Sequence, residues 1–148
     1  MSKPILCLDF DGVIHSYSSG WKGAAVIPDP PVQGAIEFIR RALEHFDVQI
    51  YSSRSGQAGG INAMQEWLYQ HSDDMRLCEA VGWPDEKPPA MVTIDDRALT
   101  FNGDWKSYDP LTLLMFKPWN KKPESSLGEA VRKARGGDAP PTPKQGFA

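Results

Sequence analysis

Two aspartates one residue apart follow an apolar run near the beginning of the chain. Residues 5–8 read Ile-Leu-Cys-Leu, and Asp9, Phe10, Asp11 and Gly12 come directly after them. Carboxylates bind hard cations such as Mg2+, and they also act as nucleophiles and as proton donors or acceptors. Taken alone, the pair is equally typical of an acidic turn, because Asp and Gly are common turn residues.

A second acidic pair favours a functional site over a turn. Residues 91–94 read Met-Val-Thr-Ile, which is typical of a buried strand, and they end in Asp95 and Asp96. Ligands of open α/β sheets bind beyond the carboxyl ends of the strands. Two parallel strands that both end in aspartates would gather up to four carboxylates at one edge, which is unfavourable without a cation. The sequence therefore predicts a Mg2+ site there.

A third apolar run leads into a loop that suits a phosphate group. Residues 48–51 are followed by serines and glycines around Ser52 and Arg54, which can donate hydrogen bonds to phosphate oxygens. Lys87 lies just ahead of the strand that ends in Asp95. A lysine among carboxylates and a phosphate would reduce their mutual repulsion and hold the transferring group.

These four features resemble the ordered motifs of the haloacid dehalogenase-like (HAD) superfamily of phosphohydrolases. Residues 9–13, Asp-Phe-Asp-Gly-Val, look like the first motif, and Ser52 after its strand looks like the second. Lys87 looks like the third motif, and Asp95 with Asp96 looks like the fourth. Four motifs in the right order are much more specific than any one of them.

The resemblance implies a Mg2+-dependent phosphoric monoester hydrolase that works through an aspartyl-phosphate. Asp9 would attack phosphorus, and Asp11 would protonate the leaving oxygen and later activate water. The Asp9 carboxylate, the Asp11 backbone carbonyl and the Asp95 side chain would hold the metal. Asp96 would support the metal or orient Lys87.

The expected substrate is a phosphorylated small molecule such as a nucleotide. Ser52 and Lys87 would bind the transferring phosphoryl group, and Arg54 would bind a more distant phosphate or the backbone of the substrate. The residues around Arg54 and Asp96 are also similar to the phosphatase domain of polynucleotide kinase-phosphatases. Residues 119–148 carry six basic and three acidic residues, so nucleic acid is the alternative partner.

Two alternative functions follow from these observations. One is a polynucleotide-end phosphatase, which an open site, Arg54 and the basic C-terminal residues favour. The other is a non-catalytic metal- or phosphate-binding module of the same fold. The presence of both Asp9 and Asp11 disfavours this second alternative, because an inactive relative could easily have lost one of them.

The motifs require an α/β fold that aligns their strands. We expect a three-layer sandwich with a mostly parallel, Rossmann-like sheet of the HAD type. Apolar residues at helical spacing predict helices within residues 32–46 and 61–68, and a short strand is expected near Ala80.

The intervals between the motifs leave no room for a full cap domain. They are about forty and thirty-five residues long, and each already contains a predicted helix. The segment Tyr17 to Gly23 should instead form a short flap beside the site, with Trp21 exposed on it. His15 is expected to be a structural residue of this flap.

Length and composition indicate one soluble domain. A chain of 148 residues that is 41% hydrophobic can bury one sizeable core. We expect a catalytic core in residues 1–119, a helix in residues 120–135 and a disordered tail in residues 136–148. Two isolated cysteines, Cys7 and Cys78, give no disulfide framework, and no apolar stretch is long enough to cross a membrane. A cytoplasmic location is therefore expected.

Overall fold

The computed structural model describes residues 2–121, and its contacts divide the chain into two units, Met1–Asp95 and Asp96–Ala148. The predicted catalytic core, residues 1–119, thus spans the boundary between these units. Almost all of the predicted helix in residues 120–135 and the whole predicted tail, residues 136–148, lie outside the described residues.

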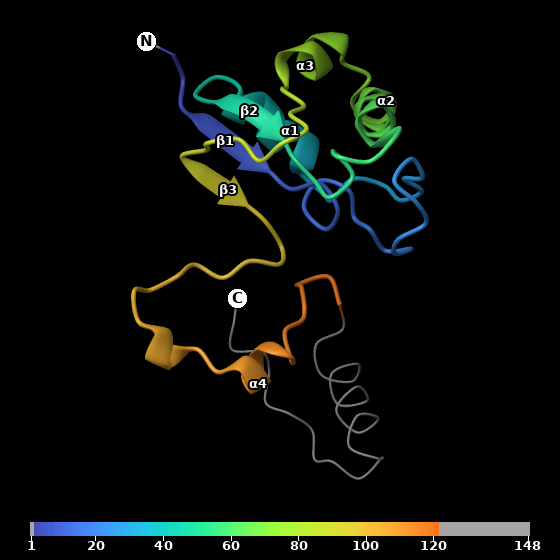
Figure 1. The fold of residues 1–148 in the computed structure, drawn as a ribbon. Helices are drawn as coiled ribbons and strands as arrows, with labels where there is room; N and C mark the ends of the chain where they lie inside the picture. Colours follow the sequence, from blue (N-terminus) through green and yellow to red (C-terminus); the bar gives the residue numbers. More distant parts are fainter. Residues whose placement is uncertain (1, 122–148) are drawn as a thin grey trace. The chain divides into compact units, whose positions relative to one another are not determined.

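The first unit contains a parallel sheet of three strands (Figure 1). β1 (Ile5–Leu8) lies in the centre, between β2 (Asp47–Ile50) and β3 (Val92–Ile94). Leu8 is in register with Ile50 on one side and with Ile94 on the other. The prediction that these three strands lie side by side and parallel is therefore confirmed, and the residues that follow them meet at one edge of the sheet.

The two neighbours of β1 differ in burial. The last three residues of β1 and the two apolar residues of β2 are buried. β3 pairs with β1 along its whole length, but the side chains of Val92 and Ile94 are 47% and 42% exposed. The expectation that residues 91–94 form a buried strand is therefore wrong. In the described residues β3 pairs with β1 only, whereas β2 is also hydrogen-bonded to Gly82 on its other side.

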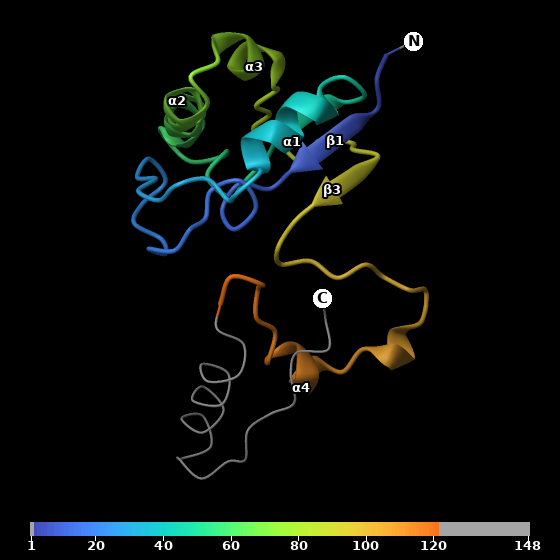
Figure 2. The same ribbon diagram turned by 180° about the vertical axis from the view of Figure 1, so that it is seen from behind.

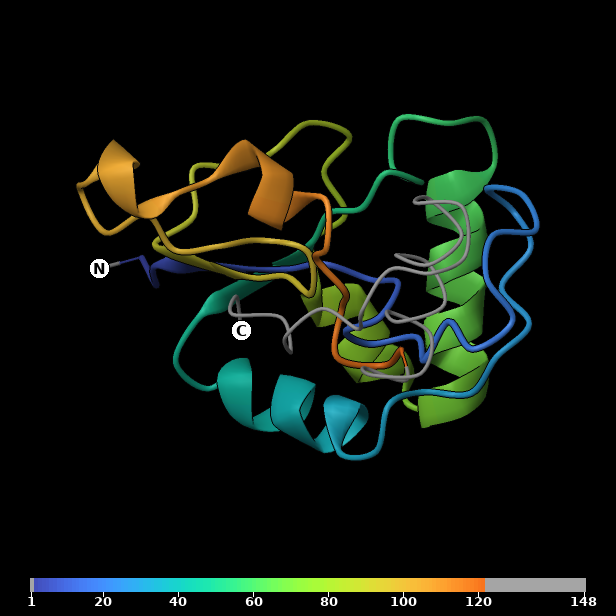
Figure 3. The same ribbon diagram turned by 90° about the horizontal axis from the view of Figure 1, so that it is seen from below.

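Helix α1 (Ala35–Ala42) covers one face of the sheet. The strands lie in front of it in Figure 1, α1 lies in front of β1 in Figure 2, and the view in Figure 3 has α1 below the strands. Its apolar side chains include Ile39, which is fully buried. The helix is shorter than the apolar spacing of residues 32–46 suggests, because the Val32 N–H donates to the Ile14 carbonyl at 2.8 Å, outside any helix.

Helices α2 (Gly60–Ser72) and α3 (Met75–Ala80) pack against each other. α2 contains the helix predicted for residues 61–68 and lies beyond the carboxyl ends of the strands (Figures 1 and 3). The strand expected near Ala80 is reduced to a single bridge between Gly82 and Gln49, and the residues before it are helical. The Asp74 carboxylate, which accepts from the Leu77 N–H at 3.1 Å, starts that helix.

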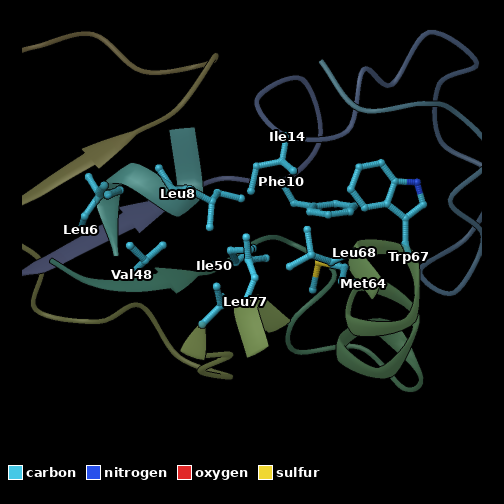
Figure 4. Close-up of a cluster of buried hydrophobic side chains, with 13 residues drawn as sticks. Leu6, Leu8, Phe10, Ile14, Val48, Ile50, Met64, Trp67, Leu68 and Leu77 are labelled. Carbon is cyan, nitrogen blue, oxygen red and sulfur yellow. The ribbon is translucent and has the colours of Figure 1, made fainter. Parts of the chain in front are cut away.

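The core of the first unit joins the sheet to the helices (Figure 4). Phe10 is fully buried and meets Trp67 of α2 edge to face, with ring centroids 5.1 Å apart. Because successive residues of an extended chain point in opposite directions, this buried ring directs both neighbouring aspartates, Asp9 and Asp11, away from the core. Phe10 therefore anchors the segment that carries the first motif.

The second unit contributes two short helical segments, the 3-10 helix η1 (Trp105–Ser107) and α4 (Pro110–Leu113). The rings of Phe101, Trp105 and Tyr108 contact one another in this unit, with centroids 4.6 to 5.8 Å apart. Within residues 2–121, no helix combines the length and the apolar character that a membrane crossing requires.

Candidate active site

Three carboxylates gather at the carboxyl edge of the sheet. One oxygen each from Asp9, Asp95 and Asp96 lies within 4.8 Å of the others. Asp9 follows β1 directly, and its N–H donates to the Ile94 carbonyl at 3.0 Å, which fixes the ends of β1 and β3 together. We call these three residues the acidic triad. The sequence predicted all three as metal ligands.

The spacing within the acidic triad suits one divalent cation. Mg2+ binds oxygens at about 2.1 Å in octahedral geometry, so two ligands of one ion lie roughly 3 to 4 Å apart. The oxygens of the triad need to approach one another only slightly to reach that spacing. Three like charges this close repel one another, and a bound cation would remove that repulsion.

Asp11 lies in a different environment from Asp9. Gly12 has a φ of 80°, the left-handed conformation that glycine adopts without strain, so the chain turns sharply after Asp11. The Asp11 carboxylate accepts hydrogen bonds from His15 Nδ1 at 2.8 Å and from Arg54 Nε at 2.9 and 3.2 Å. The Asp11 side chain is not part of the acidic triad.

These donors set the charge state of Asp11. Burial works to raise the pKa of the Asp11 carboxyl, but the hydrogen bonds from His15 and Arg54 outweigh it and hold that pKa below its usual range. Asp11 is therefore ionised in the free protein near neutral pH. We call Asp11, His15 and Arg54 the Asp11 clamp.

Arg54 is fully buried and has more partners than a simple phosphate-binding arginine would have. Besides Asp11, its Nη1 donates to the carbonyls of Gly23, Ala24 and Val26 at 2.8 to 3.2 Å. Its Nη2 has no hydrogen-bond partner among residues 2–121. Nη2 is buried as well, so the contacts of Arg54 that the structure shows are with Asp11 and with the backbone of residues 23–26.

The carbonyls that Arg54 binds belong to a loop of residues 16–31, which contains the predicted flap. The base of the 16–31 loop is closed by the Ser16 N–H, which donates to the Pro30 carbonyl at 2.9 Å. Trp21 is 45% exposed and lies over the Arg54 guanidinium, 4.7 Å from its central carbon. The loop is thus attached to the motif that follows β2.

Ser52 follows β2 at the same edge of the sheet and is buried. Its hydroxyl oxygen accepts from the Arg54 N–H at 3.1 Å, and its own N–H donates to the Ser55 hydroxyl oxygen at 3.0 Å. These local bonds shape a tight turn after β2. The Ser52 hydroxyl hydrogen can still donate to a phosphate oxygen.

Lys87 is exposed, and its position is indicated by its electrostatic effect on Cys7. Burial raises the pKa of the Cys7 thiol, a hydrogen bond with Thr93 lowers it, and the charges of Asp9, Lys87 and Asp95 have smaller effects. The Lys87 ammonium therefore lies within electrostatic range of the Cys7 thiol, as Asp9 and Asp95 do.

Comparison of the chain with protein-family models, with curated proteins and with solved structures gave no match. The function must therefore be inferred from the residues and their geometry.

Two polar residues near the site were not predicted from the sequence as site residues. His15 was expected to be structural, yet its ring contacts Asp11 directly. Asp29 is buried, its N–H donates to His15 Nε2 at 3.1 Å, and its carbonyl accepts from Trp67 Nε1 at 3.0 Å. The spacing of four residues between Asp11 and His15 was a usable signal, whereas nothing in the sequence links His15 to Asp29.

Proposed function

We propose that this protein is a Mg2+-dependent phosphatase of the HAD type that hydrolyses a phosphate monoester through an aspartyl-phosphate. The observation that carries the proposal is the acidic triad at the carboxyl ends of β1 and β3, together with a fourth carboxylate, Asp11, that is held separately. Such a site has one carboxylate for nucleophilic attack and another for proton transfer.

The proposed reaction begins with Asp9. Its carboxylate oxygen attacks phosphorus in line, the bond from phosphorus to the leaving oxygen breaks, and a proton passes from Asp11 to that oxygen. In the second half, Asp11 takes a proton from a water molecule as the water oxygen attacks phosphorus and releases Asp9. A bound Mg2+ would offset the negative charge on the phosphoryl oxygens.

Asp11 must be protonated for the first half of this reaction. The Asp11 clamp favours its ionised form in the free protein. A bound phosphate brings negative charge close to Asp11, which favours the protonated carboxyl. We therefore propose that substrate binding shifts the Asp11 carboxyl to its protonated form. The Ser52 hydroxyl and the Lys87 ammonium would hold the phosphoryl oxygens, and Arg54 would act on the reaction through its hydrogen bonds to Asp11.

The substrate class depends on what can approach the edge of the sheet. The exposed ring of Trp21 beside Arg54 favours a substrate with an aromatic group, and a nucleotide is the simplest such phosphate ester. The same ring could stack on the terminal base of a polynucleotide, so a polynucleotide-end phosphatase is the second candidate function.

A panel of phosphate esters tests the proposal. The purified protein with Mg2+ is assayed for phosphate release from mononucleotides, sugar phosphates and a 3′-phosphorylated oligonucleotide. We expect turnover of at least one of them, loss of turnover when a chelator removes Mg2+, and loss in Asp9→Asn. Faster release from the oligonucleotide than from mononucleotides would favour the second candidate.

Asp47→Asn is the matched control, because Asp47 is exposed and lies at the amino-terminal end of β2, opposite the site. Its turnover should equal that of the unmodified protein. Mg2+ binding without release of phosphate from any ester would instead indicate a non-catalytic module. Turnover that persists in Asp9→Asn would exclude the aspartyl-phosphate.

A further inference from the structure

His15 is a fully buried imidazole whose two nitrogens both have partners. Nδ1 lies 2.8 Å from Asp11 Oδ1, and Nε2 lies 3.1 Å from the backbone nitrogen of Asp29. The ring also packs against Phe10, Tyr17 and Trp67, with centroid distances of 5.6 to 5.9 Å. These aromatic contacts fix the plane of the imidazole.

The contact with Asp29 determines which nitrogen carries the hydrogen. The backbone N–H of Asp29 can only donate, so Nε2 of His15 must accept. The hydrogen of the neutral ring is therefore on Nδ1, where it points to Asp11 Oδ1. A backbone group thus selects the tautomer that binds the carboxylate.

Asp29 is itself held in place. Its carboxylate accepts from the Ser19 N–H at 2.7 Å and from the Ser19 hydroxyl at 2.5 Å, and its carbonyl accepts from Trp67 of α2. The hydrogen-bonded chain therefore runs from the 16–31 loop through Asp29 and His15 to Asp11. Each of the three residues also has a contact outside this series of hydrogen bonds. Trp67 donates to Asp29, aromatic rings pack against His15, and Arg54 donates to Asp11.

The hydrogen bonds from His15 and Arg54 are distributed unequally over the two oxygens of the Asp11 carboxylate. Oδ1 accepts from His15 at 2.8 Å and from Arg54 at 3.2 Å, whereas among residues 2–121 Oδ2 accepts only from Arg54, at 2.9 Å. A carboxylate oxygen has two lone pairs in the carboxylate plane, so Oδ1 is fully used and Oδ2 keeps one.

We propose that His15 is a positioning residue for Asp11, which it orients so that Oδ2 is the oxygen that exchanges the proton with the substrate. This inference rests on the proposed phosphatase activity. Asp11 Oδ2–H would give its proton to the leaving oxygen as the ester bond breaks, and Oδ2 would later take a proton from the attacking water. His15 neither gains nor loses a proton in either half.

Two substitutions of His15 separate the effect of its hydrogen-bond donor from the effect of its side-chain size. His15→Ala removes the donor to Asp11, whereas His15→Asn places an amide NH2 near the position of Nδ1 and can keep it. His45→Ala is the control, because His45 is an exposed histidine in the turn between α1 and β2. The kinetic constants kcat and KM are measured for phenyl phosphate and for p-nitrophenyl phosphate, whose leaving group needs little protonation.

Proton donation by a positioned acid is typically worth roughly 10²–10⁴-fold, so a misplaced Asp11 should lose part of that factor. We expect His15→Ala to lower kcat for phenyl phosphate by about tenfold or more, to lower kcat for p-nitrophenyl phosphate by less than about threefold, and to leave KM nearly unchanged. His15→Asn should recover most of the loss. Equal losses on both esters, or no recovery in His15→Asn, would overturn the proposal.

Crystal structures of both variants provide a measurement that does not need activity. In His15→Ala, the Asp11 carboxylate should rotate away from the position that it has in the unmodified protein. In His15→Asn, it should keep that position. An unmoved carboxylate in His15→Ala would reject the positioning role even in an active enzyme. If the unmodified protein hydrolyses neither ester while the carboxylate rotates as expected, the proposed function fails and the orienting contact stands.

Discussion

Asp9 and Asp11 are separated by one residue, yet they belong to two different electrostatic environments. Asp9 lies in the acidic triad, where its neighbours are two other carboxylates. Asp11 lies in the Asp11 clamp, where its neighbours are a guanidinium and an imidazole N–H. Like charges favour a bound metal ion, whereas the guanidinium and the imidazole N–H fix the Asp11 carboxylate without one. The comparison teaches that two carboxylates one residue apart can lie in opposite electrostatic environments.

The largest expected difference between the two environments is in metal affinity. Asp9→Asn should weaken Mg2+ binding by about 100-fold or more, because it removes a charged ligand, while Asp11→Asn should weaken it by less than about tenfold. Isothermal titration calorimetry with Mg2+ measures both. Similar losses in the two variants would show that the Asp11 carboxylate also binds the ion and would break the comparison.

Removal of the guanidinium tests the Asp11 clamp itself. Arg54→Ala leaves a mostly buried carboxylate without its charged partner, which should lower the free energy of unfolding by about 3–5 kcal/mol. Arg40→Ala is the control, since Arg40 is 39% exposed and its ion pairs should contribute about 0–1 kcal/mol. Urea unfolding measures both variants. The loss in Arg54→Ala should be smaller when Asp11 is already Asn, and strictly additive losses would contradict the pairing.

The backbone that carries Arg54 is also constrained. A Cβ atom at Gly60 would lie 1.9 Å from the Arg54 carbonyl oxygen, whereas one at Gly56 would meet no atom within 4 Å. Gly60→Ala should therefore destabilise the protein by roughly 1–3 kcal/mol, and Gly56→Ala should have little effect. Thermal unfolding of the two variants provides the measurement. Equal melting temperatures would mean that the turn after β2 yields easily.

The chain of hydrogen bonds behind His15 should make stability depend on pH. Burial works to raise the pKa of Asp29, but the hydrogen bonds from Ser19 lower it below its usual value. A depressed pKa stabilises the folded state above the unfolded pKa of about 4, and this contribution disappears as pH falls through the folded value. Relative to Asp29→Asn, the unmodified protein should be about 1–2 kcal/mol more stable at pH 7.

That difference should shrink progressively below about pH 4. Urea unfolding of both proteins from pH 7 downward measures it. A difference that does not change with pH would show that the charge of Asp29 contributes nothing and that only its shape matters.

The smallest effect is expected at Trp21, on the exposed side of the Asp11 clamp. Trp21→Ala removes a ring that lies over Arg54 but is 45% exposed, so it should cost about 0.5–1 kcal/mol of stability. Trp67→Ala removes a buried ring and should cost about 3–5 kcal/mol. Chemical denaturation compares the two, and a loss at Trp21 as large as that at Trp67 would place Trp21 energetically in the core.

Local sequence patterns were sufficient for the strands and for the acidic edge. The apolar run of β1 and the β-rich residues of β2 and β3 specify strands, and their order along the chain is compatible with a parallel sheet. Asp9 and Asp95 follow strands that lie side by side, so their proximity follows from the fold class. The left-handed turn at Gly12 was likewise readable, because glycine adopts that conformation without strain.

Only the tertiary structure determined the partners of Asp11. Arg54 lies 43 residues from Asp11 in the sequence, and a pattern of residue types cannot say whether an arginine after a strand will bind a phosphate or a carboxylate. The same holds for His15 and Asp29, whose contact depends on the path of the 16–31 loop. Strand positions follow from local periodicity, whereas the pairing of buried polar groups depends on which segments the completed fold brings within 3 Å.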